Sequence, residues 1–415
     1  MCLYLLDCAV AAFGTAVNKK DMKKILCIAA LAALTMSALA APKKAVQETV
    51  SPASDSLITY VGRTLVDGGS VSFDWTATYV RIAFEGNYLA INASDTYRDY
   101  FNVWIDKAPT AEPDRIIAIG NGSEKSTFGK IEANSVYDGR IEIVNEADFK
   151  ALYGKKIPSQ HFVTIQKRTE GEQGTTTFKE VITKGKLIQA MPLRPRVIEF
   201  VGDSYTCGYG SENSVSSDPF TPETENCGKS YASVVSRYFN ADYVVVAHSG
   251  MGITRNYNSN VAGWYMPERY TQTFDMDRET KWDASQSGIK PDITVIYLGT
   301  NDFSVSLQPS EASFTADYLT LLQEIKDNYG EDHPILCMSS ICDENLSRYV
   351  HAAVKKSGMK NVNYLDFTPG IHHNDDRNLG ASFHPNQLGH QKLAYQVIPY
   401  IATLTSWGIN NEVIK

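Results

Sequence analysis

The sequence predicts two domains, an all-β sandwich followed by an α/β domain whose parallel sheet lies between layers of helices. Length is the first reason, because 415 residues exceed the size of one typical domain. The second reason is a change of pattern at Pro195. Before it, short segments alternate apolar and polar residues, as antiparallel strands with one wet face do. After it, continuous apolar runs alternate with helical stretches, which is typical of a parallel sheet covered on both faces.

The N-terminal residues predict a secretory signal peptide over 22–40. A basic start at Met22 precedes an apolar run over 25–34, and small residues at 38–40 form a cleavage site. Met22 is therefore a better start than the first residue, and we interpret 1–21 as an upstream segment with a misassigned start. An uncleaved anchor is the alternative, although the apolar run is short for a bilayer. We expect a secreted or periplasmic protein.

The charge balance excludes two classes of partner. The chain carries a net charge of −8, and without residues 1–40 it would hold 35 basic and 45 acidic residues, a net of −10. An acidic protein repels phosphate backbones and anionic membranes. We therefore expect no nucleic acid partner and, after signal cleavage, no membrane partner. The cysteine and histidine spacings match no metal motif, so no cofactor or metal is expected either.

Residues 41–55 are polar and predict a linker, and residues 56–188 predict the β domain. Its expected strands alternate apolar and polar residues and cover 71–75, 79–86, 88–95, 100–106, 115–120, 140–145, 161–169 and 178–183. Dipeptides of the hairpin type predict tight turns at 67–68, 86–87 and 138–139. The segment contains no convincing helical pattern, so we expect a sandwich or a barrel.

Residues 189–415 predict the α/β domain. Continuous apolar runs predict strands over 197–201, 242–250, 293–302, 334–340 and 362–367, and helices are expected over 229–239, 313–328, 344–358 and 386–407. Ligands of such sheets bind at the carboxyl ends of the strands. A functional site is therefore expected where the strands end.

Four short motifs fall at these places. Gly-Asp-Ser, ending in Ser204, follows the first strand, and the glycines Gly250 and Gly252 follow the second. Gly-Thr-Asn-Asp, which contains Asn301, follows the third strand, and His384 begins the last helix. Each motif alone is a weak signal. Because all four converge on one edge of the predicted sheet, together they predict one site.

The residue types at this site fit acyl transfer. A serine hydroxyl needs an adjacent base to attack an ester, and the imidazole of His384 has a suitable pKa. The tetrahedral oxyanion that forms needs preorganised hydrogen-bond donors. The N–H of Ser204, the N–H of Gly250 or Gly252 and the side-chain amide of Asn301 would supply three donors.

These motifs resemble the sequence blocks of the SGNH or GDSL hydrolase superfamily. With a β domain ahead of it, the layout is similar to carbohydrate esterase family two, acetyl xylan esterases with an N-terminal jelly-roll domain. The resemblance implies a flavodoxin-like sheet and a carboxylic ester hydrolase that deacetylates plant polysaccharides. It also implies Ser204 as the nucleophile, His384 as the base, and an oxyanion hole of Ser204, Gly252 and Asn301, with Gly250 as the alternative glycine.

One position departs from the superfamily pattern. Many members carry an aspartate three residues before the histidine, whereas this chain has Ala381 there. A carboxylate normally orients the imidazole. A main-chain carbonyl could replace it and leave a Ser–His dyad, an aspartate at 366, 375 or 376 could reach the ring, or the domain could be inactive. We favour the dyad.

Further candidates concern the substrate and the thiols. Trp264, Tyr265 and Tyr205 are candidate sugar-binding residues, although plain packing explains the first two equally well. In an exported protein cysteines permit disulfides, and the pair Cys207 and Cys227 is preferred, while Cys337 and Cys342 could pair or stay reduced. Two other functions stay open: an esterase of another O-acetylated glycan such as peptidoglycan, or a carbohydrate-binding protein without catalysis.

Overall fold

The computed structural model describes residues 47–120, 137–259, 263–340, 344–367 and 375–409. The expected signal peptide, the upstream segment and Cys342 lie outside the described residues. The chain divides into two units, Met1–Gln47 and Glu48–Lys415, and both expected domains belong to the second unit. Within the described part, no helix has the length and the apolar character that crossing a membrane requires.

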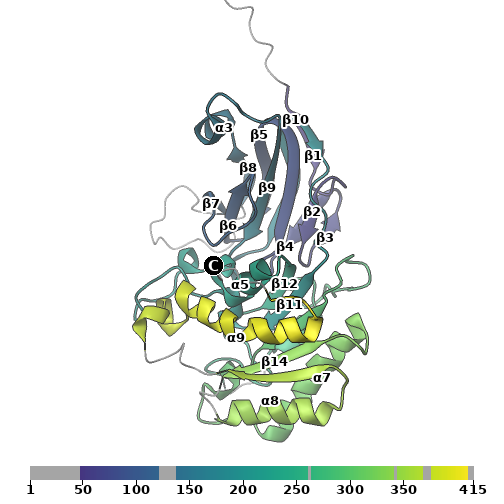
Figure 1. The fold of residues 1–415 in the computed structure, drawn as a ribbon, viewed down its shortest axis with the longest axis vertical. Coiled ribbons are helices and arrows are strands. Elements are labelled where there is room, and N and C mark those ends of the chain that lie inside the picture. Colours follow the sequence, from purple (N-terminus) through teal and green to yellow (C-terminus); the bar gives the residue numbers. More distant parts are fainter. Residues whose placement is uncertain (1–46, 121–136, 260–262, 341–343, 368–374, 410–415) are drawn as a thin grey trace, which may run out of the picture. The chain divides into compact units, whose positions relative to one another are not determined.

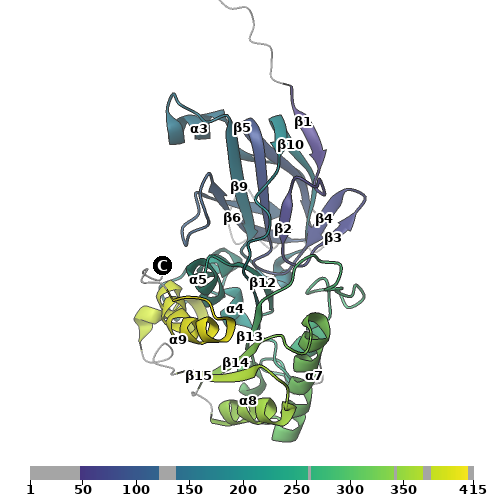
Figure 2. The same ribbon diagram turned by 45° about the vertical axis from the view of Figure 1, so that its right-hand side comes forward.

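The β domain is a ten-stranded antiparallel sheet whose main path runs β3-β4-β10-β5-β9-β6-β7, while β1 pairs with β10, and β2 and β8 pair with β5 (Figures 1 and 2). Its strands are β1 (Thr49–Pro52), β2 (Thr59–Val61), β3 (Leu65–Asp67), β4 (Ser70–Phe73), β5 (Tyr79–Asp95), β6 (Arg98–Ile105), β7 (Arg115–Gly120), β8 (Tyr137–Val144), β9 (Gln160–Lys167) and β10 (Thr176–Ile188). Strand β1 lies inside the stretch expected to be a linker.

Two of the three expected hairpin turns are wrong. Residues 67–68 do lie at the β3–β4 turn, but 86–87 continue β5 and 138–139 lie inside β8. Gly86 and Gly185 instead mark where the backbones of β5 and β10 come unusually close. A Cβ on Gly86 would lie 2.2 Å from the Lys184 carbonyl oxygen, and one on Gly185 2.0 Å from that of Glu85. These glycines serve close backbone approach, not a turn.

The β domain also contains a short helix that the sequence pattern did not predict, α3 (Glu146–Tyr153). Asn145 caps it, since its side chain accepts hydrogen bonds from two backbone N–H groups of the first turn, and Asp148 returns the contact. Phe149 is buried and joins the apolar core of the β domain, where its ring packs against Phe84. Capping and one buried aromatic are enough for a helix too short to show a period.

The second domain has the expected parallel sheet, in the order β12-β11-β13-β14-β15, which is the flavodoxin-like order. Its strands are β11 (Val197–Gly202), β12 (Asp242–Ala247), β13 (Ile293–Tyr297), β14 (Ile335–Ser340) and β15 (Val362–Phe367). Its main helices are α5 (Tyr231–Tyr238), α7 (Glu311–Tyr329), α8 (Glu344–Ser357) and α9 (Gln387–Thr405). All five strands and four helices correspond to expected ones, so the fold class predicted from the sequence is confirmed.

Helices cover both faces of the parallel sheet. Figures 1 and 2 show α5 and α9 on one face and α7 and α8 on the other. Ile198 and Phe200 of β11 belong to the apolar cluster of α5 and α9, whereas Val197 and Val201 belong to that of α7 and α8. Successive side chains of a strand point to opposite faces, so a continuous apolar run is what a doubly covered strand requires.

Buried charges join the β domain to the α/β domain. Asp242, the first residue of β12, is fully buried and pairs with Arg81 of β5. It also accepts a hydrogen bond from the Tyr79 hydroxyl (2.9 Å) and from the Arg194 N–H (2.8 Å). Arg63, equally buried, donates to the Gln272 carbonyl (2.8 Å). Buried charges persist only where partners satisfy them, so these contacts fix how the two domains pack.

The expected disulfide between Cys207 and Cys227 is wrong, because both are buried thiols outside any disulfide, as is Cys337. Each of the two thiols instead contacts the β domain. The Cys207 Sγ–H donates to Glu170 (3.6 Å), and the Cys227 Sγ–H donates to the Lys167 carbonyl (3.1 Å). The spacing of the cysteines in the chain carried no information about these contacts across the domain interface.

Asp242→Asn should destabilise the protein by about 3–5 kcal/mol, because it leaves the buried Arg81 guanidinium without its charge partner. Urea denaturation measures the change. Asp332→Asn is the matched control, since Asp332 pairs with Lys360 where both side chains are more than 70% exposed, and it should leave the urea midpoint nearly unchanged. Equal effects of the two substitutions would show that the interface charges do not hold the domains together.

Candidate active site

Ser204 stands at the turn between β11 and the short helix α4 (Ser204–Cys207). The preceding Gly202 packs so closely on this helix that a Cβ would lie 2.0 Å from the Thr206 hydroxyl oxygen. Asp203 caps the helix by accepting the Tyr205 N–H (3.2 Å). Ser204 is therefore the first residue of a helix at the carboxyl end of a central strand, and the N–H groups of a first helical turn have no acceptor within the helix.

A turn just before α9 orients His384. Ser382 and Phe383 both have positive φ, 52° and 59°, a conformation that residues other than glycine rarely adopt. Their N–H groups donate to the carbonyls of Asp218 (2.8 Å) and Ser216 (2.9 Å), which holds the turn. The turn aims the Ser382 carbonyl at the imidazole, whose Nδ1 lies 2.9 Å from that oxygen. Its Nε2 lies 2.8 Å from the Ser204 Oγ.

The three aspartates considered as partners of His384 have other contacts. Asp366 accepts a hydrogen bond from the Ser347 hydroxyl (2.9 Å), Asp375 pairs with Arg377, and Asp376 accepts from the Ser216 hydroxyl (3.1 Å). Ala381 is fully buried beside the turn. The Nδ1 partner of the imidazole is thus a main-chain carbonyl, which corresponds to the favoured expectation from the sequence.

Burial keeps the His384 imidazole neutral. It lowers the pKa of His384 to about 4, although the hydrogen bond to the Ser382 carbonyl acts in the opposite direction. An aspartate behind the ring would have raised this pKa, as Asp275 does for the imidazole of His248. A neutral imidazole with Nδ1–H on a carbonyl leaves the Nε2 lone pair directed at the serine hydroxyl.

Asn301 and a glycine loop complete the edge of the site. Asn301 lies in a 3₁₀ turn (Thr300–Phe303) that follows β13, and its side-chain amide donates to Asp203 (3.2 Å) and to the Met251 carbonyl (2.9 Å). Asp302 accepts the N–H groups of three consecutive residues, 253–255. The two polar residues of the third motif therefore have different roles. Asn301 lines the cavity, and Asp302 holds the loop over 253–255.

The structure favours Gly250 over Gly252 as the loop glycine at the cavity. Gly250 lines the cavity that contains Ser204 and has φ of 77°. The Gly252 N–H donates to the Asn256 side chain (3.2 Å). A Cβ on Gly252 would lie 1.9 Å from the Arg255 carbonyl. Gly252 therefore serves loop packing, and this differs from the expectation drawn from the resemblance.

A cavity of about 710 Å³ surrounds the Ser204 hydroxyl. Its described walls are Glu172, Asp203, Ser204, Tyr205, Tyr209, Ser249, Gly250, Tyr257, Tyr297, Thr300, Asn301, Phe303, Ser304, Ser340, Leu346, Ser382, Phe383 and His384. Of the three candidate sugar-binding residues, Tyr205 lies on the wall. Trp264 and Tyr265 do not line it: the Trp264 ring packs against the Arg269 guanidinium, 3.9 Å from the ring centroid.

Sequence reasoning missed several wall residues, of which Phe383, Phe303 and Glu172 show why. Phe383, with 54% of its surface exposed, sits next to His384 in the chain, so that neighbourhood was a usable signal. Phe303 directly follows the third motif and lies two residues after the predicted site residue Asn301, so the same signal applied to it. Glu172 belongs to the β domain, and its sequence context gave no sign that it reaches the other domain.

The described residues include one group that could hold a metal ion: Glu170, Cys207 and Glu225, whose ligand atoms lie within 4.8 Å of one another. Metal binding needs a deprotonated thiol, and burial raises the pKa of Cys207 well above its ordinary value. The Oε2 atom of Glu170 already accepts the Ser249 N–H (2.6 Å). These groups act as a structural contact under the site, and we derive no metal chemistry from them.

The amino-acid sequence of the chain is similar to that of known esterases. Residues 200–392 match the model of the GDSL-like Lipase/Acylhydrolase family. The chain is 26% identical over 360 residues to an acetylxylan esterase / glucomannan deacetylase of Cellvibrio japonicus, covering 82% of this chain and 89% of that protein. It is 32% identical over 256 residues to the cellulase/esterase CelE of Acetivibrio thermocellus, covering 60% of this chain and 30% of CelE.

Solved structures give the same result. A family two carbohydrate esterase from Clostridium thermocellum, in complex with cellohexaose, is 27% identical, with a TM-score of 0.71 over 85% of this chain and all of that one. One from Cellvibrio japonicus is 22% identical and shares the fold, with a TM-score of 0.72 over 87% and 99% of the two chains. The predicted resemblance to SGNH hydrolases and to carbohydrate esterase family two is confirmed. The predicted enzyme class, an ester hydrolase, is confirmed with it.

The pKa values of His384 and His248 should be shifted in opposite directions from the ordinary imidazole pKa of about 6.5. Isotope-labelled histidine observed by NMR, assigned with His384→Gln and His248→Gln, should show His384 neutral down to about pH 5 and His248 still protonated at about pH 8. Burial causes the first result, and Asp275 causes the second by overcoming burial. Asp275→Asn should lower the pKa of His248. Two ordinary titration curves would contradict the described environments.

Proposed function

We propose that this chain is a secreted or periplasmic serine esterase that removes O-acetyl groups from plant polysaccharides. The observation that carries the proposal is the 2.8 Å contact between the Ser204 hydroxyl and the His384 Nε2 on the wall of a large cavity. Secretion rests on the signal peptide expected over 22–40. The division into a β domain over 56–188 and an esterase domain over 189–415 is part of the proposal.

Acylation begins when the Ser204 Oγ attacks the acetyl carbonyl carbon and its proton passes to the His384 Nε2. The Nδ1–H stays on the Ser382 carbonyl, which keeps the ring in place during the transfer.

In the resulting tetrahedral intermediate the carbonyl oxygen carries a negative charge. In this proposal the N–H groups of Ser204 and Gly250 and the amide of Asn301, all residues of the cavity wall, stabilise that charge. The Asn301 amide exchanges one of its two hydrogen bonds, to Asp203 or to the Met251 carbonyl, for the oxyanion.

Collapse of this intermediate breaks the bond to the sugar oxygen, which takes the proton from the His384 Nε2 and leaves as a hydroxyl. The acetyl group now esterifies Ser204. Water then attacks the acetyl carbonyl while the His384 Nε2 accepts a proton from that water. Collapse of the second intermediate breaks the bond to the Ser204 Oγ, which takes this proton from His384, and releases acetic acid, which loses its remaining proton to solvent and becomes acetate. No group other than these side chains and water is required for the proton balance.

A dyad of this kind makes a particular demand on the oxyanion. The His384 imidazolium formed during attack has no carboxylate behind it, and burial disfavours its charge. The developing oxyanion is the opposite charge that appears at the same moment close by, so it stabilises the imidazolium when it is needed. The donors around the oxyanion should consequently carry much of the rate acceleration.

The relatives and the cavity support the proposed substrate class. The curated relatives are named as a cellulase/esterase and as acetylxylan esterases that are also glucomannan deacetylases. The cavity walls include the aromatic rings of Tyr205, Tyr209, Tyr257 and Phe383, and flat apolar faces with polar tips suit sugar rings. Acetylated xylan or glucomannan is therefore the proposed polymer, and acetate is the proposed product.

Ser204→Ala should lower the rate of p-nitrophenol release from p-nitrophenyl acetate by at least about 10³-fold, because the acyl-enzyme cannot form. The same loss is expected for acetate release from acetylated xylan or glucomannan. Ser313→Ala, an exposed serine on α7, is the matched control and should keep full activity. Retained activity of Ser204→Ala would remove the proposed nucleophile. A wild-type preference for acetylated peptidoglycan over both plant polymers would overturn the proposed substrate class.

Asn301→Ala should lower kcat by about 10²–10³-fold with little change in KM, since an oxyanion donor acts in the transition state. Steady-state kinetics on p-nitrophenyl acetate measure the split, with a melting curve to confirm that the variant is folded. Asn363→Ala on β15, outside the cavity wall, is the control. A change confined to KM would assign Asn301 to ground-state binding instead.

A further inference from the structure

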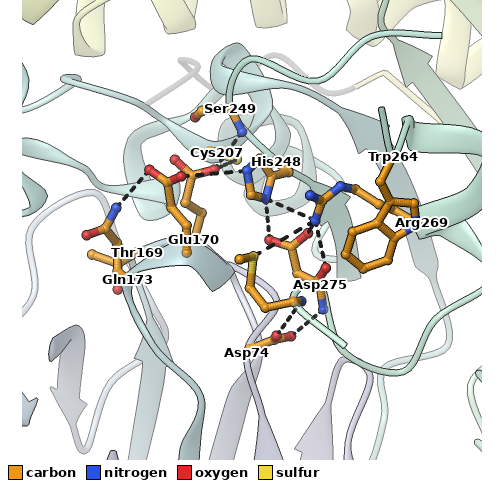
Figure 3. Close-up of polar contacts among 12 residues, drawn as sticks. Asp74, Thr169, Glu170, Gln173, Cys207, His248, Ser249, Trp264, Arg269 and Asp275 are labelled. Carbon is orange, nitrogen blue, oxygen red and sulfur yellow. Dashed lines mark hydrogen bonds and ion pairs between the residues drawn. The ribbon is translucent and has the colours of Figure 1, made fainter. Parts of the chain in front are cut away.

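One segment of the β domain reaches the edge of the parallel sheet. It runs from Glu170 through a 3₁₀ turn (Gly171–Gln173) directly after β9. The Oε2 atom of Glu170 accepts the Ser249 N–H at 2.6 Å, which ties the segment to the loop after β12 (Figure 3). A Cβ on Gly171 would lie 2.6 Å from the Cβ of Asp275. The segment therefore packs so closely against the α/β domain that no side chain fits at position 171.

The segment places Glu172 in the cavity. Among the described wall residues, it is the one that comes from the β domain, and it shares the cavity with Ser204, Gly250 and His384. Its side chain is 44% exposed, so its carboxylate can still meet a ligand. Its Oε1 accepts a hydrogen bond from the Gln173 side chain (3.1 Å). Its Oε2 lies 3.7 Å from the Nε2 of His248.

A cluster of buried charged side chains, His248, Asp275 and Arg269, lies behind Glu172. The Nδ1 of His248 lies 2.6 Å from Asp275, which also accepts a hydrogen bond from Arg269 (2.6 Å), and Trp264 covers that guanidinium (Figure 3). Burial disfavours the imidazolium, but Asp275 and Glu170 raise the pKa of His248 to about 9. The ring is therefore charged at neutral pH, and its Nε2 faces the Glu172 Oε2 across 3.7 Å. Burial and Glu170 raise the pKa of Glu172, and the His248 imidazolium counteracts them by favouring the carboxylate.

This charged cluster does not cancel the negative charge of the cavity. Its two cations, His248 and Arg269, face the carboxyl groups of Asp275, Glu170 and Glu172. A fourth carboxyl group, that of Asp74, accepts the Asp275 N–H, and burial and Asp275 raise its pKa. The carboxyl groups therefore outnumber the cations. The described cavity wall contains two carboxyl groups, those of Glu172 and Asp203, and no lysine or arginine. A carboxylate accepts hydrogen bonds from hydroxyl groups and repels anions.

We propose that Glu172 determines specificity, accepting hydrogen bonds from the hydroxyl groups of uncharged acetylated sugars and disfavouring acetylated uronic acids. This inference rests on the proposed function and names the charge class of its substrate. Discrimination of this kind combines an attractive contact for one substrate with a repulsive one for its competitor.

The test compares neutral acetylated glucomannan oligosaccharides with anionic acetylated galacturonan oligosaccharides, using kcat/KM divided by the value for p-nitrophenyl acetate. Wild type should prefer the neutral substrate by at least about tenfold. Glu172→Gln should reduce that preference about tenfold, because the amide neither repels the uronate nor accepts hydrogen bonds as a carboxylate does. Added salt should raise wild-type activity on galacturonan, and should do so less for the variant.

Glu279→Gln, an exposed position outside the cavity wall, is the matched control and should leave the preference unchanged. An unchanged preference in Glu172→Gln, or a wild type without preference, would overturn the inference. Failure of the proposed function is a separate result, since it would appear as p-nitrophenyl acetate hydrolysis that does not depend on Ser204. A specificity effect cannot be mistaken for it, because each variant is referred to its own rate on the small ester.

Discussion

The hydrogen bond between the His384 Nδ1 and the Ser382 carbonyl is the constraint on which this site depends. In the proposed mechanism it takes the place of the carboxylate that stands behind the histidine in most catalytic triads. To present that carbonyl, two consecutive residues adopt positive φ, at a cost of about 1–2 kcal/mol each. The backbone carbonyls of Ser216 and Asp218 hold the strained turn. Strain of this kind persists where the surrounding structure over-determines it, and it is characteristic of functional sites.

The β domain is part of the site and not merely attached to it. The Asp242–Arg81 pair sets the contact between the domains, and at the other end of the interface Glu170 holds the loop that carries Gly250. A carboxylate on a β-domain turn thus supports the proposed oxyanion loop, and the next carboxylate along the chain lies on the cavity wall. A separated esterase domain would lack both, so the two domains should be treated as one functional body.

Most of the strands and helices could be predicted from the sequence, because hydrophobic periodicity is a local signal. The apolar runs of β11 to β15 and the four main helices were predictable, as was the convergence of Ser204, Asn301 and His384. Errors arose wherever the answer depended on contacts between distant segments. Gly86 looks like a turn residue but serves close approach to β10, Cys207 faces the β domain, and Trp264 packs on Arg269. No local pattern could have placed Glu172 in the cavity.

In the proposed mechanism a serine and a histidine act with a main-chain carbonyl in place of an acid. A crystal structure of the enzyme inactivated by a fluorophosphonate tests it most directly. We expect phosphorus bonded to the Ser204 Oγ and a phosphonyl oxygen within hydrogen-bonding distance of the Gly250 N–H and the Asn301 amide. The His384 Nδ1 should still lie on the Ser382 carbonyl. An unlabelled Ser204, or a carboxylate found against Nδ1 in the labelled enzyme, would contradict it.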